Sequence, residues 1–213
     1  MKQEYIYMNV IAPAFILLPV AIAFLKYGAL SKPARLLLGY LLIDTLVSIL
    51  SSALAFYHIA NTPLYHIATM IETVLLLYFF YGIFQQKYFA RYIPWAMVLF
   101  PVACIINTLC FQHILEFNSY TLSLQSLLII LLCFLYWWHY ENELAKPWAG
   151  VPLNWIISGL LLYFSSSFLL FTFSNAALTY LSVKNFILVW NIHATLSVVM
   201  YIFIGIGFSK YQK

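Results

Sequence analysis

Long apolar stretches separated by short polar connections make up most of the chain. Seven of them hold about 20 mostly apolar residues, the number that an α-helix needs to cross the roughly 30 Å hydrocarbon core of a bilayer. They lie at about 8–27, 35–57, 63–85, 91–112, 117–138, 152–174 and 185–208. The pattern predicts an all-α integral membrane bundle of seven transmembrane helices, forming one domain over 1–213.

Composition agrees with a membrane protein. Hydrophobic residues make up 65% of the chain and charged residues 8%, too few to cover a water-facing surface. The formal net charge is +4, but the basic residues lie singly at the ends of apolar stretches, so we expect no nucleic-acid partner. The first stretch is too long for the apolar part of a signal peptide and lacks an Ala-x-Ala-like exit. It is therefore expected to be a span rather than a cleaved leader.

The distribution of lysine and arginine predicts the orientation of the chain. One set of connections and ends carries only Lys2 and Lys184, and the other set carries eight basic residues: Lys26, Lys32, Arg35, Lys87, Arg91, Lys146, Lys210 and Lys213. Short cytoplasmic connections are enriched in these residues. We therefore expect the amino terminus outside, the carboxyl terminus in the cytoplasm, and a multi-pass location in a bacterial inner membrane.

Polar residues inside the spans recur at helical spacing. The stripes are Asp44, Ser48 and Ser51; Tyr65, Thr69 and Glu72; Asn118, Thr121 and Gln125; Asn154, Ser158 and Ser165; and Trp190, His193 and Ser197. Since an unpaired polar group in hydrocarbon is costly, each stripe is expected to face the bundle interior. Ordinary hydrogen bonds between helices are the simplest explanation of the hydroxyl groups and of Asn154.

Depth suggests a ligand site. At about 1.5 Å per residue, Glu72, Gln125, Ser165 and His193 all lie roughly 12–15 Å below the outer surface. This predicts an outward-facing pocket for a small molecule or lipid. Tyr65, Thr69 and Trp190 are expected in its wall. A contact between Glu72 and His193 is expected, either as part of the site or as a structural tie between helices.

Asp44 is expected to form a second polar node. It lies roughly 13 Å from the cytoplasmic end of its span, which places it too far from Glu72 for a direct carboxylate pair. Asn154 and Ser158 are its expected neighbours.

Prolines and cysteines bear on the fold rather than on chemistry. Pro13 and Pro19 in the first span, and Pro94 and Pro101 in the fourth, predict kinks. Cys104, Cys110 and Cys133 lie within apolar stretches without paired spacing, so we expect small buried side chains rather than a disulfide or a zinc site.

Several chemistries lack their sequence requirements. The seventh span has no lysine for a retinal Schiff base, and no phosphate-binding or nucleophile motif is present. A metal-dependent lipid hydrolase needs about three His or carboxylate ligands, and His58, His66, Glu72 and His193 have no paired spacing. We predict no cofactor, no metal and no catalytic residue. A transporter stays open, although the two halves show no visible repeat.

Four segments carry a family resemblance: PLYHIATMIETVLLLY, EFNSYTLSLQSLLIILLCFLYW, PLNWIISGLLLYFSSSFLLFTFSN and WNIHATLSVVMYIFIGIGF. Together they resemble a family of seven-helix membrane proteins, of unassigned function, that is widespread in Bacteroidota. Members are often encoded beside two-component regulators. The resemblance implies a receptor that passes ligand occupancy to a separate partner, such as a histidine kinase.

The leading hypothesis is therefore a membrane sensor for a small molecule or lipid. Its partner would dock on the 139–151 connection, on the basic helix ends or on lipid-facing helix surfaces. A small-solute transporter and an intramembrane metal-dependent lipid hydrolase are the alternatives.

Overall fold

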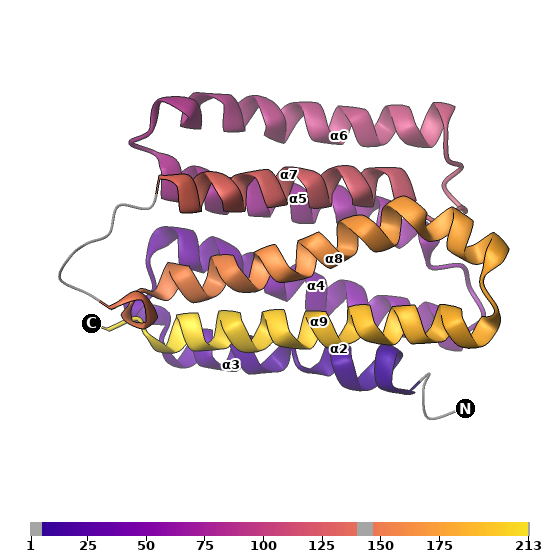
Figure 1. Ribbon diagram of the computed structural model, residues 1–213, viewed down its shortest axis with the longest axis horizontal. Helices are drawn as coiled ribbons and strands as arrows, with labels where there is room; N and C mark the ends of the chain where they lie inside the picture. Colours follow the sequence, from indigo (N-terminus) through magenta and orange to yellow (C-terminus); the bar gives the residue numbers. More distant parts are fainter. Residues whose placement is uncertain (1–5, 140–146, 213) are drawn as a thin grey trace. The chain divides into compact units, whose positions relative to one another are not determined.

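The structure, a computed structural model, describes residues 6–139 and 147–212, and every regular element in these ranges is a helix (Figure 1). The elements are η1 (Tyr7–Ile11), α2 (Ala12–Ala14), α3 (Leu17–Leu25), η2 (Tyr27–Ala29), α4 (Lys32–Phe56), α5 (Thr62–Phe84), η3 (Tyr88–Tyr92), α6 (Ile93–Cys110), α7 (Ser119–Trp138), η4 (Trp148–Gly150), α8 (Pro152–Tyr180) and α9 (Val183–Ser209). Within the described residues, seven helical segments are long and apolar enough to cross a membrane. The prediction of an all-α, multi-pass membrane protein is confirmed.

Capping residues place the helix ends a few residues from the ends of the apolar stretches. α4 begins at Lys32 because Ser31 is extended and its Oγ accepts a hydrogen bond from the Ala34 amide at 3.4 Å. Ser182 caps α9 in the same way, through the Asn185 amide at 3.4 Å. Hydropathy marks the membrane-compatible part of a helix, whereas the cap decides where the helix starts.

The first span is interrupted, as its two prolines predict. η1 is a π-helical segment, and the α-helical geometry breaks between α2 and α3. The amides of Phe15 and Ile16 bond to carbonyls only three residues earlier, at 3.2 and 3.1 Å. Proline lacks an amide hydrogen and clashes with the preceding turn, so regular α-helical bonding cannot run through Pro13 and Pro19.

The chain forms two compact units, each of which is described by itself. Unit 1 comprises Met1–Leu30 and Ser126–Lys213, and unit 2 comprises Ser31–Gln125. In unit 1, α8 and α9 pack along each other and α3 packs on α9 (Figure 1). Two glycines allow the close α8–α9 approach. A Cβ on Gly159 would lie 2.7 Å from Phe203 Cβ, and one on Gly207 would lie 2.9 Å from the Pro152 carbonyl oxygen.

Unit 2 is built on the α4–α5 hairpin, with α6 packed on α5. His58 has a positive φ of 57° just after α4, and the amides of His58 and Ile59 bond back to Ala55 and Leu54 at 3.1 and 2.9 Å. This is the left-handed helix stop usually made by glycine. At the other end of the hairpin, a Cβ on Gly82 would lie 2.8 Å from Pro33 Cγ, so the start of α4 touches the end of α5.

Candidate functional site

His193 on α9 lies against three aromatic rings of unit 1. Its ring centroid is 5.1 Å from Tyr163 in a stacked arrangement, and 5.5 and 6.1 Å from Phe171 and Trp190, which meet it edge to face. Tyr163 and Phe171 are eight residues, a little over two turns, apart on α8, so they meet His193 from different levels of that helix. The predicted site residues His193 and Trp190 are therefore in contact in an aromatic cluster.

The serine that reaches His193 is Ser166, not the predicted Ser165. Ser166 Oγ lies 3.3 Å from His193 Nδ1 and donates to the Tyr163 carbonyl at 2.8 Å. One residue along a helix turns the side chain by about 100°. Ser165 was predicted from its stripe with Asn154 and Ser158 and from its depth, and neither decides which serine of the run Ser165–Ser167 faces α9.

These contacts are compatible with a neutral imidazole that is protonated on Nδ1. If the Ser166 hydroxyl donates to the Tyr163 carbonyl, Nδ1 of His193 donates to Ser166. Nε2 carries the lone pair in that tautomer. This atom has no hydrogen-bond partner among the described residues.

The two polar stripes of the α4–α5 hairpin meet in unit 2. Ser51 Oγ lies 2.8 Å from Tyr65 Oη and accepts from Asn61 Nδ2 at 2.7 Å. Thr69 donates to the Tyr65 carbonyl at 2.7 Å and accepts from Asn118 Nδ2 at 3.2 Å. Tyr65 and Thr69, both predicted to contact a ligand, thus have partners within the protein.

The Ser51–Tyr65 hydrogen bond also fixes the register of the hairpin. Asp44 comes seven residues before Ser51, and Glu72 comes seven residues after Tyr65. In an antiparallel pair these steps lead to the same level, about 10.5 Å and two turns further along both helices. Asp44 and Glu72 accordingly interact electrostatically with each other, and both interact with Tyr65.

This register places Asp44 at about the level of Glu72, whereas the expectation that the two do not form a direct carboxylate pair stays a prediction. The depth of Glu72 was counted from the outer surface and that of Asp44 from the cytoplasmic end of its span. Added together, the two depths nearly equal the roughly 30 Å thickness of the hydrocarbon core, so the two carboxyl groups lie at similar levels. Half-buried Asp44 and Glu72 form one acidic level in the middle of the hairpin. Acidic residues at this depth are candidates for a functional role, because an isolated charge in hydrocarbon is costly.

Gln125 is a buried polar residue at the end of unit 2. Its side chain is 4% exposed, and its Nε2 has no hydrogen-bond partner among the described residues. A buried amide donor without an acceptor costs about 1–3 kcal/mol, so the position favours a bound water or a ligand atom.

Asn154 holds the start of α8 in unit 1. It is fully buried, accepts from Tyr136 Oη at 2.7 Å and donates to the Trp148 carbonyl at 3.1 Å. Ser158 lies half-buried one turn further along α8. Their expected contact with Asp44 joins the two units and stays a prediction, as does the expected Glu72–His193 contact.

Two polar residues outside the predicted stripes are well supported by hydrogen bonds. Gln112, after α6, is 5% exposed and uses its whole amide: Oε1 accepts from Asn107 Nδ2 and the Tyr120 amide, and Nε2 donates to the Phe117 carbonyl and Ser119 Oγ. His66, on α5, has both ring nitrogens engaged in unit 2. The search for polar stripes did not identify these two roles, because both side chains bond to the segment between α6 and α7 rather than to a stripe on a neighbouring helix. A glutamine within the apolar boundary of the fourth span was the available signal.

The histidines and cysteines considered as metal ligands have the following positions and partners. The described residues contain no group of three or more His, Cys, Asp or Glu side chains placed to hold an ion. Both His66 nitrogens have other partners, and His58 forms the helix stop.

The three cysteines are free thiols rather than disulfides. Cys104 and Cys133 are buried as expected, whereas Cys110 is exposed near the end of α6.

The arrangement thus offers an imidazole among aromatic rings in unit 1 and an acidic level in unit 2. The chain was also compared with known proteins, and no protein-family model, curated protein or solved structure matches it.

Proposed function

We propose that this protein is a membrane receptor that binds a small apolar molecule or lipid and passes occupancy to a separate partner. The observation that carries the proposal is the His193 ring among Tyr163, Phe171 and Trp190, with an Nε2 that has no hydrogen-bond partner among the described residues. With Nδ1 protonated, this Nε2 accepts a hydrogen bond from the ligand. Apolar walls with a few placed polar atoms are typical of small-molecule sites. The matching ligand has an apolar body and one O–H or N–H donor.

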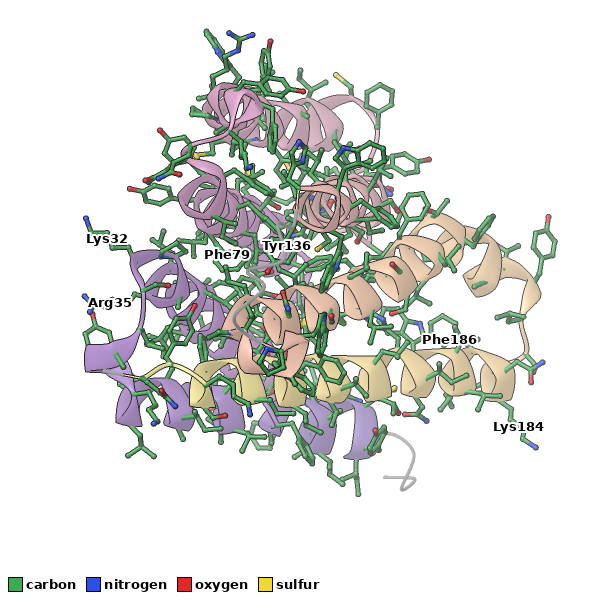
Figure 2. The ribbon with its side chains drawn as sticks, turned by 60° about the vertical axis from the view of Figure 1, so that its left-hand side comes forward. Lys32, Arg35, Phe79, Tyr136, Lys184 and Phe186 are labelled. Carbon is green, nitrogen blue, oxygen red and sulfur yellow. The ribbon has the colours of Figure 1, made fainter. Side chains whose placement is uncertain are left out.

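Charge at the helix ends supports the proposed orientation. In unit 2, the Pro33–Gly82 contact brings Lys32 and Arg35 to the same end as Lys87, and Lys32 and Arg35 project outward from α4 (Figure 2). In unit 1, Lys184 projects from the start of α9, whereas Lys210 follows its end (Figure 2). The basic end of each unit is proposed to be cytoplasmic, in a bacterial inner membrane.

The signal is proposed to leave through the cytoplasmic helix ends to a partner such as a histidine kinase. The 139–151 connection, expected to help dock this partner, lies mostly outside the described residues. Its described end, from Trp148, packs on Trp137 and Trp155 with centroids 6.2 and 5.2 Å away. A ligand that alters the packing of α8 on α9 would thereby reach this connection.

Matched lipid pairs test the ligand class. Purified wild type, His193→Phe and the control His113→Phe are melted with oleyl alcohol or its methyl ether, which lacks the donor. Phenylalanine keeps a ring at 193 but removes Nε2. At 100 times its Kd the alcohol should stabilise wild type and the control by about 2.7 kcal/mol relative to ligand-free protein. The ether at the same concentration should stabilise them less, and His193→Phe should abolish the difference between the two ligands. Equal effects of alcohol and ether on wild type would exclude this role of Nε2.

One observation favours a second candidate, a proton-coupled transporter. Asp44 and Glu72 interact at one level of adjacent spans, and paired intramembrane acids are typical of proton relays. Proteoliposomes containing a trapped pH-sensitive dye separate the candidates. A transporter acidifies them on solute addition and loses this activity in Glu72→Gln, whereas a receptor gives no flux.

A further inference from the structure

Unit 2 contains a hydrogen-bond donor without an acceptor and, on another helix, an acceptor without its usual donor. Gln125 on α7 is 4% exposed, and its Nε2 has no hydrogen-bond partner among the described residues. Pro101 lies inside α6 and has no amide hydrogen. The carbonyl of Met97, four residues before Pro101, therefore lacks its α-helical donor.

Hydrogen bonds fix the register of α6 against α7. The two helices run in opposite directions, since a short connection joins the end of one to the start of the other. The Cys104 thiol of α6 shares a hydrogen bond with the Thr121 hydroxyl of α7. Gln112 in the connection bonds to Asn107 on α6 and to Ser119 on α7, which indicates the same register.

This register brings the two unsatisfied groups to nearly the same depth. Gln125 lies four residues beyond Thr121 on α7, which is the level of Phe100, four residues before Cys104 on α6. Met97 lies three residues, roughly 4.5 Å, beyond Phe100. Helix carbonyl groups point toward the carboxyl end of their helix, so the Met97 oxygen points back toward the Gln125 level.

Both groups also lie on the packed sides of their helices. Met97 is seven residues from Cys104, which is about two turns, so the two residues share one side of α6. The next two residues, Val98 and Leu99, are each 61% exposed on the other side. On α7, Gln125 follows Thr121 by about one turn, and both are buried.

A single bridging molecule fits these two groups. Nε2 of Gln125 makes no direct bond to the Met97 oxygen, and two successive hydrogen bonds of about 2.8 Å span roughly 5 Å. The bridging molecule must accept from Nε2 and donate to the carbonyl. Water does both, whereas an ether, a carboxylate or a metal cation cannot donate. We propose that a buried water molecule bridges Gln125 Nε2 and the Met97 carbonyl, and thereby ties α7 to the proline break in α6.

The neighbouring donors are engaged elsewhere. α6 remains α-helical through Pro101, so the Val102 amide bonds to the Val98 carbonyl rather than to Met97. The Thr121 hydroxyl donates to Asn118 Oδ1. Ordered water commonly satisfies backbone groups that proline frees inside a membrane helix. The bridge lies wholly within unit 2, so it does not depend on the ligand proposed at His193.

Solid-state NMR of the full chain tests the bridge. The protein is placed in bilayers of dioleoyl phosphatidylcholine, which carries no hydroxyl group, so hydroxyl proton signals from the lipid are excluded. Labelling methionine carbonyl carbons and valine nitrogens selects Met97, because Met97–Val98 is the only Met–Val pair in the sequence. Magnetisation from bound water should reach both the Met97 carbonyl and the Gln125 side-chain nitrogen, which is assigned from its backbone connections.

Two variants and a control make the outcome decisive. Gln125→Leu removes the donor and should abolish the water signal at the Met97 carbonyl. Pro101→Ala supplies an amide for that carbonyl and should abolish the water signal at the Gln125 side chain. Pro94→Ala should preserve both signals, because Pro94 lies in the first turn of α6, where the missing amide has no intrahelical partner.

The proposal is overturned if water fails to reach either of the two groups in wild type. It is equally overturned if Pro101→Ala leaves the Gln125 signal at wild-type strength. Alanine favours helix, so this variant keeps the test decisive even where Gln125→Leu does not fold.

Discussion

Hydroxyl side chains in the spans bond largely within their own helices. Thr45, Thr69 and Thr73 each donate to the carbonyl four residues earlier, at 2.7, 2.7 and 2.6 Å. Ser166 and Ser167 both donate to the Tyr163 carbonyl. A hydroxyl can thus be satisfied without a neighbouring helix or a ligand. Histidine, glutamine and carboxyl groups are the more informative residues, because their polar atoms need partners further away.

Gln112 gives the clearest prediction at the residue scale. Gln112→Met keeps the approximate shape of the side chain but leaves the Asn107 amide, the Tyr120 amide, the Phe117 carbonyl and the Ser119 hydroxyl without their shared partner. We expect a loss of about 2–4 kcal/mol in unfolding free energy. Thermal melting in one detergent measures it, with Gln86→Met at an exposed position as control. Equal melting temperatures for the two variants would contradict this role.

The packing of two helices determines which of their residues lie at the same level, and the polar stripe of a single helix does not. The Asp44 and Tyr65 stripes share a helical period, but only the turn at His58 and the Ser51–Tyr65 bond decide that Asp44 stands level with Glu72. In the same way, α8 and α9 approach closely only where Gly159 and Gly207 remove the side chain. Small residues in such positions allow the packing contacts that associate helices in lipid.

At the scale of elements, we expect Gly207→Ala to weaken the α8–α9 pair. The added Cβ would lie 2.6 Å from Ile156 Cγ1 and 2.9 Å from the Pro152 carbonyl oxygen, and backbone cannot yield as a side chain can. Overpacking of this kind costs about 1–3 kcal/mol.

Gly39→Ala is the matched control, because nothing lies within 4 Å of its added Cβ and alanine favours helix by about 1 kcal/mol. Melting temperatures should therefore rank Gly39→Ala above wild type and Gly207→Ala below it. The reverse order would mean that the α8–α9 approach is looser than the structure shows.

For the whole molecule, basic residues gather at one end of each unit. Lys32 and Lys87 lie at the same end of the α4–α5 hairpin because Pro33 contacts Gly82, and Lys210 lies at the opposite end of α9 from Lys184. The Trp137–Trp148–Trp155 cluster lies at the α7–α8 connection, and indole prefers the headgroup layer. The orientation proposed above can be tested on each unit by itself.

Reporter fusions test that orientation in cells. Alkaline phosphatase, which is active only outside the cytoplasm, should be active when inserted after His58 and inactive after Lys87. A fluorescent protein after Lys213 should fold and fluoresce in the cytoplasm. Activity after Lys87 together with a dark carboxyl-terminal fusion would invert the proposed topology.

The sequence by itself determined the number and placement of the spans. Crossing a bilayer requires a length of apolar residues, which is a property of consecutive positions and can be read without tertiary contacts. It also determined the break in the first span, since Pro13 and Pro19 cannot supply amide hydrogens. His193 and Glu72 stood out for the same kind of reason, because an ionisable group in an apolar stretch is costly wherever it folds.

Only the tertiary structure decided which polar atoms meet. Ser166 rather than Ser165 reaches His193, Asp44 stands level with Glu72, and Gln112 and His66 hold a connection that no stripe predicted. Each outcome depends on the rotation and register of one segment against another. These are set by turns, glycines and hydrogen bonds between residues distant in the chain, and helical periodicity gives the face of a helix but not its partner.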